Sequence, residues 1–394
     1  MCDISFKQKE NEYLVRLEGK INSENAANVE QKIERSISDG ENIKVIMDLL
    51  DLEYISSAGL RVILKAKKKY QDVKLVNVQP AVYDIFETTG FTAMMPISKV
   101  LREISIENCE QIGYGMTGLV YRMDMDTLVK VFHPGISRET AENERNSAKT
   151  AFICGIPTAI SYELATCNGC YAIIFEQLKA KTVSEMVNEN PQKVEEYGIR
   201  MGKLLKEIHT LKPADGRLND IKALYIERCR KMREWLTEEE TEELVKLYER
   251  LPDTGTLLHG DFHSKNIMEQ NGELLLIDMG DVGYGHPILD WAGIYLSYIA
   301  MNRQQPDGTL QTLGLNKEKA DMIWRKMLET YFDTTDDTVL DKKAELIRIY
   351  GMAKSSLVPV LAPNFPEDYL QMVISVTKET IIPTIRQSDI KIDF

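Results

Sequence analysis

Three polar residues in the second half of the chain have the types and spacing that phosphoryl transfer requires. Asp261 and Asn266 stand in a D-x4-N arrangement within TLLHGDFHSKNIM, and Asp278 opens a D-x-G sequence after the apolar run ELLLI. A carboxylate such as Asp261 can accept or orient the proton of an acceptor hydroxyl. Asn266 and Asp278 offer the hard oxygen ligands that Mg²⁺ prefers when it bridges nucleotide phosphates. The pattern therefore predicts a nucleotide-dependent phosphotransfer site.

A glycine-rich turn upstream has the form of a phosphate-binding loop. Gly113, Gly115, Gly118 and Val120 give GxGxxGxV inside ISIENCEQIGYGMTGLVYRMDMDTLVKVF, which predicts an antiparallel hairpin. Glycines allow the backbone to approach polyphosphate and to turn N–H groups toward it. Dinucleotide-binding folds use the same spacing, but a helix then follows the loop. Here a strand follows, which favours the kinase version.

Lys130 and a glutamate after it complete the predicted phosphate site. Lys130 lies ten residues after Val120, where kinase-like folds place the lysine that holds the α- and β-phosphates. Such a lysine is oriented by a carboxylate on the next helix, for which we choose Glu144, with Glu142 as the alternative. A solvent-facing lysine on an edge strand is the other interpretation of Lys130. The ordered set of glycine loop, lysine, glutamate, D-x4-N and D-x-G favours the phosphate site.

The form HGDxHxxN, with HGD where protein kinases have HRD, resembles the aminoglycoside phosphotransferase and choline kinase superfamily. The resemblance covers roughly residues 105–300 by motif and the remainder by length. It implies a bilobal protein-kinase-like fold with ATP in the cleft and a largely helical C-terminal lobe. It also implies that Asp261 is the catalytic base, that Asn266 and Asp278 bind Mg²⁺, and that Lys130 with Glu144 clamps the ATP phosphates.

The resemblance extends to residues around these motifs. FEQL, residues 175–178, matches the hinge between the lobes, so the backbone of Glu176 and Leu178 is expected to bind adenine. His259 and His263 are expected to brace the catalytic loop, because a zinc site would need further ligands. Asp290 is expected to anchor that loop's backbone. Asp281 is expected either to touch metal or acceptor or only to fix the loop.

The first hundred residues predict a separate small α/β domain. Short apolar runs at 43–47 and 73–78, and a weakly alternating stretch at 5–20, predict strands. Helical spacing at 26–37, 60–66 and 82–86 places helices between and after them. The domain boundaries expected from the whole pattern are 1–104, then 105–178 for the N-terminal lobe and 179–394 for the C-terminal lobe.

Ser57 is the candidate modification site of this first domain. It follows a strand and a loop in DLLDLEYISSAGLRVIL, at the start of a helix where phosphate would meet unpaired N–H groups. The alternative is that Ser57 is only the N-cap of that helix. Residues 3–104 resemble the STAS domain of anti-sigma factor antagonists, in which the matching serine is phosphorylated and controls binding to an anti-sigma factor kinase. Ser56 stands where that family often has Asp, which departs from its pattern.

Composition narrows the classes of partner. The formal charge of −13 argues against nucleic acid, and no apolar run is long enough for a spanning helix or a signal core, so a cytoplasmic protein is expected. Residues 1–105 hold 15 basic and 16 acidic side chains, so the negative charge lies almost wholly after them. That excess would suit a cationic acceptor, although solvated acidic helices explain it equally well. The acidic runs at 238–243 and 333–337 look like helix starts and are not assigned to a pocket.

Two cysteines are close enough in sequence for a zinc or redox site to be considered. Cys167 and Cys170 form a single CxxC around Asn168-Gly169, a pair of residues typical of a two-residue hairpin turn. A zinc or redox site would need a second pair of cysteines or histidine partners. The hairpin is therefore the preferred interpretation.

These observations together predict a phosphotransferase, dependent on ATP and Mg²⁺, that acts on a hydroxyl of a small molecule. An amino sugar, an amino alcohol or a related metabolite is the expected acceptor, and the STAS-like domain is expected to regulate or dock the enzyme. One alternative is a signalling adaptor whose kinase-like part acts on a protein, with Ser57 as a candidate, or only binds nucleotide. A purely structural interaction protein would have no affinity for ATP.

Overall fold

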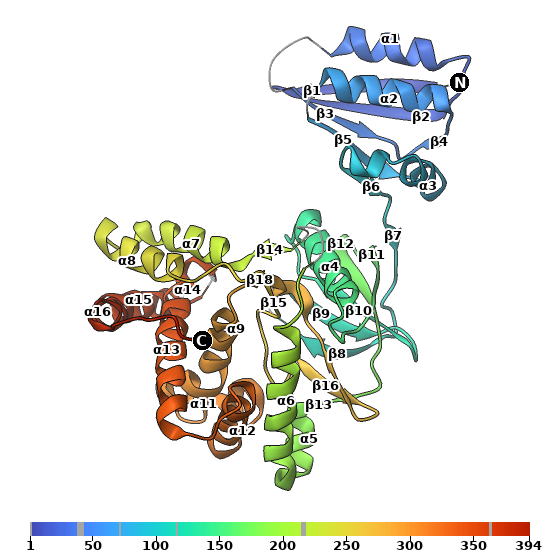
Figure 1. Ribbon diagram of the computed structural model, residues 1–394. Helices are drawn as coiled ribbons and strands as arrows, with labels where there is room; N and C mark the ends of the chain where they lie inside the picture. Colours follow the sequence, from blue (N-terminus) through green and yellow to red (C-terminus); the bar gives the residue numbers. More distant parts are fainter. Residues whose placement is uncertain (1, 38–42, 71, 116, 214–217, 362–364) are drawn as a thin grey trace. The chain divides into compact units, whose positions relative to one another are not determined.

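The computed structural model describes residues 2–37, 43–70, 72–115, 117–213, 218–361 and 365–394, and it divides into two compact units, Met1–Ile104 and Ser105–Phe394 (Figure 1). Each unit encloses a hydrophobic core of its own. Within the described residues no helix combines the length and the apolar character needed to cross a membrane.

The first unit is a mixed β-sheet with three helices. The strands of its sheet are β1 (Cys2–Lys9), β2 (Glu12–Ile21), β3 (Lys44–Asp48), β4 (Leu52–Ile55), β5 (Asp72–Val78) and β6 (Ile97–Lys99), and the two-residue β7 (Arg102–Glu103) lies outside this sheet. Its helices are α1 (Ala26–Ser36), α2 (Ser57–Lys69) and α3 (Pro80–Thr88). The order β1-β2-β3-β5-β6, with β4 beside β2, begins as an antiparallel hairpin and continues in parallel. The predicted α/β architecture is confirmed.

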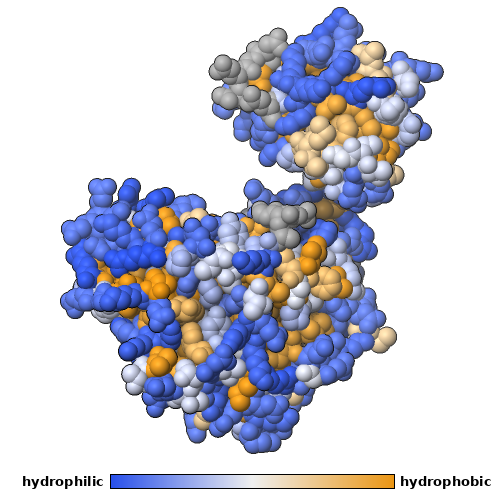
Figure 2. Space-filling view, in the orientation of Figure 1, coloured by the Kyte–Doolittle hydropathy of each residue, from blue (hydrophilic) through white to orange (hydrophobic). Residues whose placement is uncertain are grey.

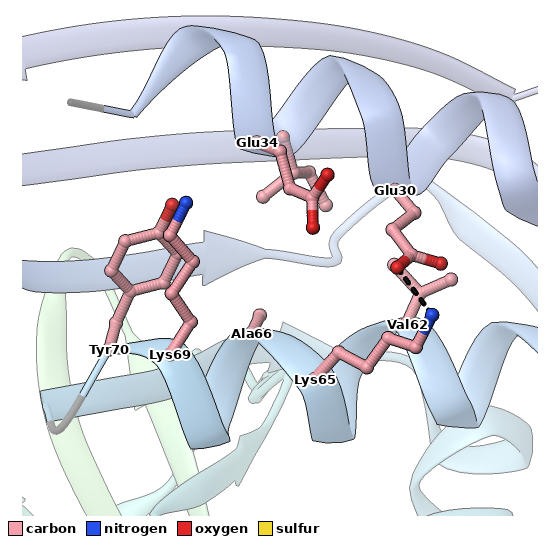
Figure 3. Close-up of a pocket in the computed structure, with 8 residues that line it drawn as sticks. Glu30, Glu34, Val62, Lys65, Ala66, Lys69 and Tyr70 are labelled. Atoms are coloured by element: carbon pink, nitrogen blue, oxygen red, sulfur yellow. Dashed lines mark hydrogen bonds and ion pairs between the residues drawn. The ribbon is translucent and has the colours of Figure 1, made fainter. Parts of the chain in front are cut away.

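A shallow groove runs between α1 and α2 (Figure 3). Glu30 of α1 and Lys65 of α2 form an ion pair of 2.5 Å across it, and Ile33, Val62 and Ala66 line it. Its volume of about 20 Å³ is room for about one water molecule, so it is a seam between packed helices and no ligand site. The outer surface of the two helices is hydrophilic (Figure 2).

The second unit begins with an antiparallel sheet. Its strands are β8 (Glu110–Tyr114), β9 (Gly118–Arg122), β10 (Thr127–Phe132), β11 (Ser161–Cys167) and β12 (Cys170–Glu176). They lie in the order β11-β12-β10-β9-β8, and α4 (Arg138–Ile153) packs against β11 and β12. Cys167 and Cys170 pair across a turn in which Asn168 and Gly169 have positive φ, which confirms the predicted hairpin.

The rest of the second unit is largely helical, as predicted. The helices are α5 (Val183–Glu189), α6 (Val194–Ile208), α7 (Ile221–Lys231), α8 (Glu238–Glu249), α9 (Ile288–Tyr295), α10 (Met301–Gln304), α11 (Gly308–Leu313), α12 (Lys317–Tyr331), α13 (Asp337–Ser355), α14 (Val358–Leu361), α15 (Glu367–Val376) and α16 (Ile382–Gln387). Close packing of α6 on α12 depends on Gly198 and Gly202, where an added Cβ would lie 2.7 Å from the Lys326 Cβ and 2.9 Å from the Thr330 Cβ.

Two small sheets interrupt the helices and frame the candidate site. One has the order β13-β16-β17, with strands β13 (Lys181–Thr182), β16 (Ile267–Gln270) and β17 (Glu273–Leu276). The other has the order β14-β18-β15, with strands β14 (Asn219–Asp220), β18 (Gly283–Gly285) and β15 (Thr256–Leu258). Because β15 ends at Leu258 and β16 begins at Ile267, the HGDFHSKN segment is a loop held at both ends by sheets.

Candidate active site

Asp261 and Asn266 contact each other within this loop. The Asn266 side-chain Nδ2 donates to the Asp261 carboxylate Oδ2 and to its backbone oxygen, both at 3.0 Å. The His263 Nε2 lies 3.4 Å from the same carboxylate, of which 46% is exposed. Partial burial alone would raise the pKa of Asp261, but His263, Lys354 and His259 hold this pKa well below its ordinary value. The carboxylate is therefore ionised and open, as a proton acceptor must be.

Asp290 anchors the backbone of the loop, which confirms the prediction for it. Its two carboxylate oxygens accept from the His259 N–H at 2.9 Å and the Gly260 N–H at 2.7 Å. His209 approaches one of them at 3.1 Å. Asp290 is buried, yet its pKa is lowered, because these contacts outweigh the desolvation that would raise it. His259 braces the loop as expected, since its Nδ1 accepts from the Asp261 N–H.

Gly260 must be glycine at this place. Its φ is +87°, and a Cβ there would lie 2.4 Å from the backbone oxygen of Asp281. The catalytic loop and the segment after the D-x-G therefore touch through their backbones. Asp281 contributes its backbone to this contact.

The D-x-G segment lies beside Glu144, which belongs to α4. Asp278 has a left-handed conformation with φ 60° and ψ 64°, which is uncommon for a residue other than glycine and is typical of a functional position. A Cβ on Gly280 would be 3.5 Å from the Glu144 Cγ, so α4 packs directly on this turn. Glu144 thus connects the sheet that carries Lys130 with the loop that carries Asp278.

The Lys130–Glu144 pair forms as predicted in sequence, and Glu142 takes another partner. The Lys130 Nζ lies 2.7 Å from the Glu144 Oε1, and each side chain is only 13% exposed. Burial raises the pKa of Glu144 although Lys130 opposes it. Glu142 instead pairs with Arg138 along α4. Val120 is the cross-strand partner of Lys130, so both face the same side of the sheet.

The glycine-rich turn connects β8 to β9. The Gly115 N–H donates to the Gly118 oxygen at 2.9 Å, and the Gly115 oxygen is 3.2 Å from the His133 Nε2. A Cβ on Gly118 would be 2.4 Å from the Val131 oxygen, so only glycine fits against β10. Gly113 is paired with Val120 across the hairpin. Gly113, Val120 and Lys130 therefore lie in one cross-strand row of the sheet.

The hinge segment borders a cleft of about 450 Å³ that Gln177, Leu178 and Lys179 help to line. The Glu176 N–H donates to the Ile160 oxygen and its carboxylate accepts from the Ile160 N–H.

The two predicted Mg²⁺ ligands suit that ion. The Asn266 amide nitrogen is turned to Asp261, which leaves its oxygen for a cation. Together with an Asp278 carboxylate oxygen this gives hard donors. Within the described residues no group of three or more His, Cys, Asp or Glu side chains could hold a metal, so phosphate oxygens and water would have to complete the coordination.

Acidic side chains of the runs at 238–243 and 333–337 form helix caps and ion pairs. Glu240 forms the capping box of α8 with Thr237, and Glu239 and Glu243 face Arg386. Asp333 pairs with Lys206, and Asp336 caps α13.

Sequence reasoning missed Lys354, whose Nζ donates to the Gly260 oxygen at 3.3 Å.

Ser57 belongs to the first unit and is not the helix cap. Ser56 caps α2 by accepting from the Gly59 N–H at 3.3 Å, so the alternative interpretation of Ser57 as N-cap is wrong. Ser57 is the first residue of α2 and is exposed.

Comparison with known proteins agrees with both units. Residues 108–321 match the phosphotransferase enzyme family, and residues 3–104 match the STAS domain. The putative anti-sigma factor antagonist BtrV of Bordetella bronchiseptica is 38% identical over 86 residues, which are 21% of this chain and 73% of that protein. The gentamicin complex of APH(2'')-IIa is 17% identical, covers 77% of this chain and 97% of its own, and has a TM-score of 0.50. The ADP-bound aminoglycoside phosphotransferase APH(2'')-Ib is also 17% identical, over 77% and 98% of the two chains, with a TM-score of 0.49.

Proposed function

The chain belongs to the phosphotransferase enzyme family and contains a STAS domain, and from this we propose that it transfers the γ-phosphate of ATP to a hydroxyl group of a small molecule. The acceptor classes we put forward are amino sugars, amino alcohols and related metabolites. The observation that carries the proposal is the ion pair of 2.7 Å between the Lys130 Nζ and the Glu144 Oε1. The Glu144 side chain in turn packs against Gly280 of the D-x-G turn. This contact joins the sheet that would hold phosphate to the loop that would hold metal.

In the proposed mechanism the chain supplies position and charge. Lys130, fixed by Glu144, would bind the α- and β-phosphates below the glycine loop. Asn266 and Asp278 would hold Mg²⁺, which neutralises phosphate charge in such reactions. Asp261 would orient the acceptor hydroxyl and take its proton as the oxygen attacks the γ-phosphorus, while ADP leaves. Its lowered pKa keeps the Asp261 carboxylate deprotonated at neutral pH.

We further propose that the STAS domain regulates or docks the enzyme through Ser57. The exposed side chain at the first turn of α2 would place a phosphate next to backbone N–H groups that have no partner within the helix. The partner we put forward is an anti-sigma factor or a related signalling protein. This carries over from BtrV, which is 38% identical in this region.

The same likeness favours a second candidate function, a signalling adaptor. In that case the kinase-like unit acts on a protein, Ser57 among the candidates, or only binds nucleotide. Phosphopeptide mapping after incubation with ATP separates the two, using wild type and Asp261→Asn. Ser57 phosphate in wild type alone would support a protein acceptor, and its absence from both would exclude phosphorylation of Ser57 by this chain.

ATP consumption with Mg²⁺ tests the main proposal. We expect turnover with at least one hydroxyl compound from a panel of amino sugars, amino alcohols and sugars. Replacing the proposed base in Asp261→Asn is expected to lower kcat by roughly 10²–10⁴-fold. A thermal-shift measurement should show that the variant still folds and binds ATP. Binding without turnover in wild type would favour the adaptor, and no binding would refute the phosphate site.

A further inference from the structure

Lys354 occupies a position on α13 that its neighbours make apolar. Ile347, Tyr350 and Gly351 precede it on the same face of the helix and are buried. The helix packs along α9 (Figure 1). An ammonium group that leaves water in such surroundings needs polar partners to replace its hydration. The contacts of the Lys354 ammonium therefore decide what the residue does.

The ammonium group contacts the peptide bond that leads into the proposed base. The Lys354 Nζ donates to the Gly260 backbone oxygen at 3.3 Å. The N–H of the same peptide bond belongs to Asp261 and donates to the His259 Nδ1 at 3.2 Å. Side chains therefore hold both polar groups of the Gly260–Asp261 peptide. Of the two side chains, Lys354 is the one that comes from outside the catalytic loop.

This peptide needs to be held because it follows a glycine. Gly260 has a φ of +87°, and glycine allows wide rotation of the backbone. The Gly260 N–H is held by Asp290 at 2.7 Å, so Asp290 fixes the peptide bond before the glycine. Lys354 fixes the peptide bond after it. The two contacts together set the direction in which the chain leaves Gly260, and hence where the Asp261 carboxylate points.

A glycine in α9 makes room for the contact. A Cβ on Gly293 would lie 2.9 Å from the Lys354 Nζ and 3.7 Å from the Gly260 oxygen. The first distance is too short for a methyl group and a nitrogen atom in a packed interior. The end of a lysine side chain moves more easily than a helix backbone. An added methyl group should therefore displace the ammonium from the Gly260 oxygen.

The surroundings keep the Lys354 side chain protonated. Burial would lower its pKa, but Tyr225, Asp261 and Asp281 raise it. The centre of the Tyr225 ring lies 6.0 Å from the Lys354 Nζ. An ammonium group can only donate hydrogen bonds, and those of a charged donor are stronger than those between neutral groups. The contact with the Gly260 oxygen is of this stronger kind.

We propose that Lys354 is a positioning residue, whose ammonium holds the Gly260–Asp261 peptide in the orientation that presents the Asp261 carboxylate to the acceptor. The inference rests on the proposed phosphotransfer, in which Asp261 is the base. Lys354 itself touches neither the acceptor nor the nucleotide in this proposal and acts through the backbone of the loop. Gly293 belongs to the same device, because it leaves the space that the ammonium occupies.

The test uses the full chain with three variants and a control. Lys354→Met removes the donor, and Gly293→Ala keeps the lysine but fills the space beside its Nζ. The double variant combines them, and the control Lys342→Met removes an exposed lysine of the same helix. ADP release from ATP and Mg²⁺ gives kcat and KM with glucosamine, ethanolamine, glucose or water as acceptor. Hydrogen–deuterium exchange of peptides covering residues 257–266 reports the catalytic loop without turnover.

Lys354→Met and Gly293→Ala should each lower kcat roughly ten- to hundredfold and leave KM for ATP and acceptor within about twofold, as expected when a reacting group is misplaced by about 1 Å. The double variant should lose no more than the weaker of the two single variants, because both changes break one contact. Amide exchange of the loop should become faster in all three. Lys342→Met should match wild type in every measurement.

Several results would overturn the inference. Losses that multiply in the double variant would show that Lys354 and Gly293 act separately. A loss confined to KM would show an effect on ligand binding. Wild-type kcat in Gly293→Ala, or wild-type exchange of the loop in both single variants, would show that the contact does not hold the base.

Gly293→Ala keeps the inference testable if Lys354→Met does not fold. Failure of the phosphotransfer proposal is distinguishable, because ADP release would then be absent from wild type with every acceptor. The exchange comparison still decides in that case. Faster exchange of the catalytic loop in the variants would support the contact, and unchanged exchange would refute it.

Discussion

Replacing Asp290 should markedly lower the free energy of unfolding of the second unit, although Asp290 takes no part in the proposed reaction itself. The carboxylate accepts two backbone N–H groups of the catalytic loop and faces the His209 Nε2. Asp290→Ala leaves these donors buried with no acceptor. Leaving a buried donor without its acceptor costs about 1–3 kcal/mol for each group, and Asp290→Ala does this to two backbone N–H groups. We therefore expect a loss of about 4 kcal/mol in the free energy of unfolding.

Asp290→Asn separates the hydrogen bonds from the charge. Its amide retains one acceptor oxygen and turns an NH₂ group toward the remaining N–H donor, so one hydrogen bond is lost and not all of them. The expected loss is about 2 kcal/mol, between wild type and Asp290→Ala. Asp253→Ala serves as control, because Asp253 is 85% exposed in its ion pair with Lys222 and such a pair contributes less than about 1 kcal/mol.

Tryptophan fluorescence reports this unit alone. All three tryptophans of the chain, Trp235, Trp291 and Trp324, lie in the second unit, and Trp291 adjoins Asp290 in sequence. With a urea slope of about 3 kcal/mol per M, the Asp290→Ala midpoint should fall by roughly 1.3 M. A midpoint within about 0.2 M of wild type would refute the reasoning, because the loop's backbone would then not depend on this carboxylate.

Two further predictions concern charge in the same unit. Lys130→Met should weaken ATP binding at least about tenfold in a calorimetric titration, because the lysine would hold the phosphates. The variant should stay folded, because burial already favours the protonated form of Glu144, which needs no positive partner. The matched change Lys149→Met, at an exposed lysine of α4, should leave the ATP affinity unchanged in the same titration. His286 is buried, and burial with nearby His209 lowers its pKa from 6.5 to about 4. The unfolded chain therefore takes up a proton near pH 6.5 that the folded chain refuses until about pH 4, so stability should fall by about 2 kcal/mol between pH 7 and pH 5. Urea unfolding of His286→Asn should show a shallower pH dependence, and equal slopes in both proteins would contradict this.

The phosphate-binding motifs could be predicted from sequence because local geometry constrains their residues. Gly118 is glycine since the Val131 oxygen leaves no space for a Cβ, and Gly260 is glycine since Asp281 lies against it. Such constraints act over short stretches of chain and leave a pattern that can be recognised there. The predicted hairpin at Asn168-Gly169 has the same origin, since positive φ favours these residue types.

Other features depend on which way a side chain points, and the sequence left them open. Glu142 and Glu144 are two residues apart on α4 and therefore face different sides, so only the three-dimensional structure shows that Glu144 meets Lys130. Ser56 and Ser57 are both suitable helix caps by type. The short strands β4 and β6, of four and three residues, carry too few residues for a recognisable alternation.

Lys354 shows why a contact between distant elements is harder to predict from sequence than a local motif. It lies 94 residues from Gly260 in sequence, and neither Tyr225 nor Gly293 is its neighbour in any local pattern. Its one sequence signal is a lysine on the apolar face of a helix, which long side chains at a protein surface also produce. The glycine loop and the D-x4-N and D-x-G motifs, by contrast, each lie within a few consecutive residues. A contact made by residues of α7, α9 and α13 therefore becomes visible only once the three helices are placed in the fold.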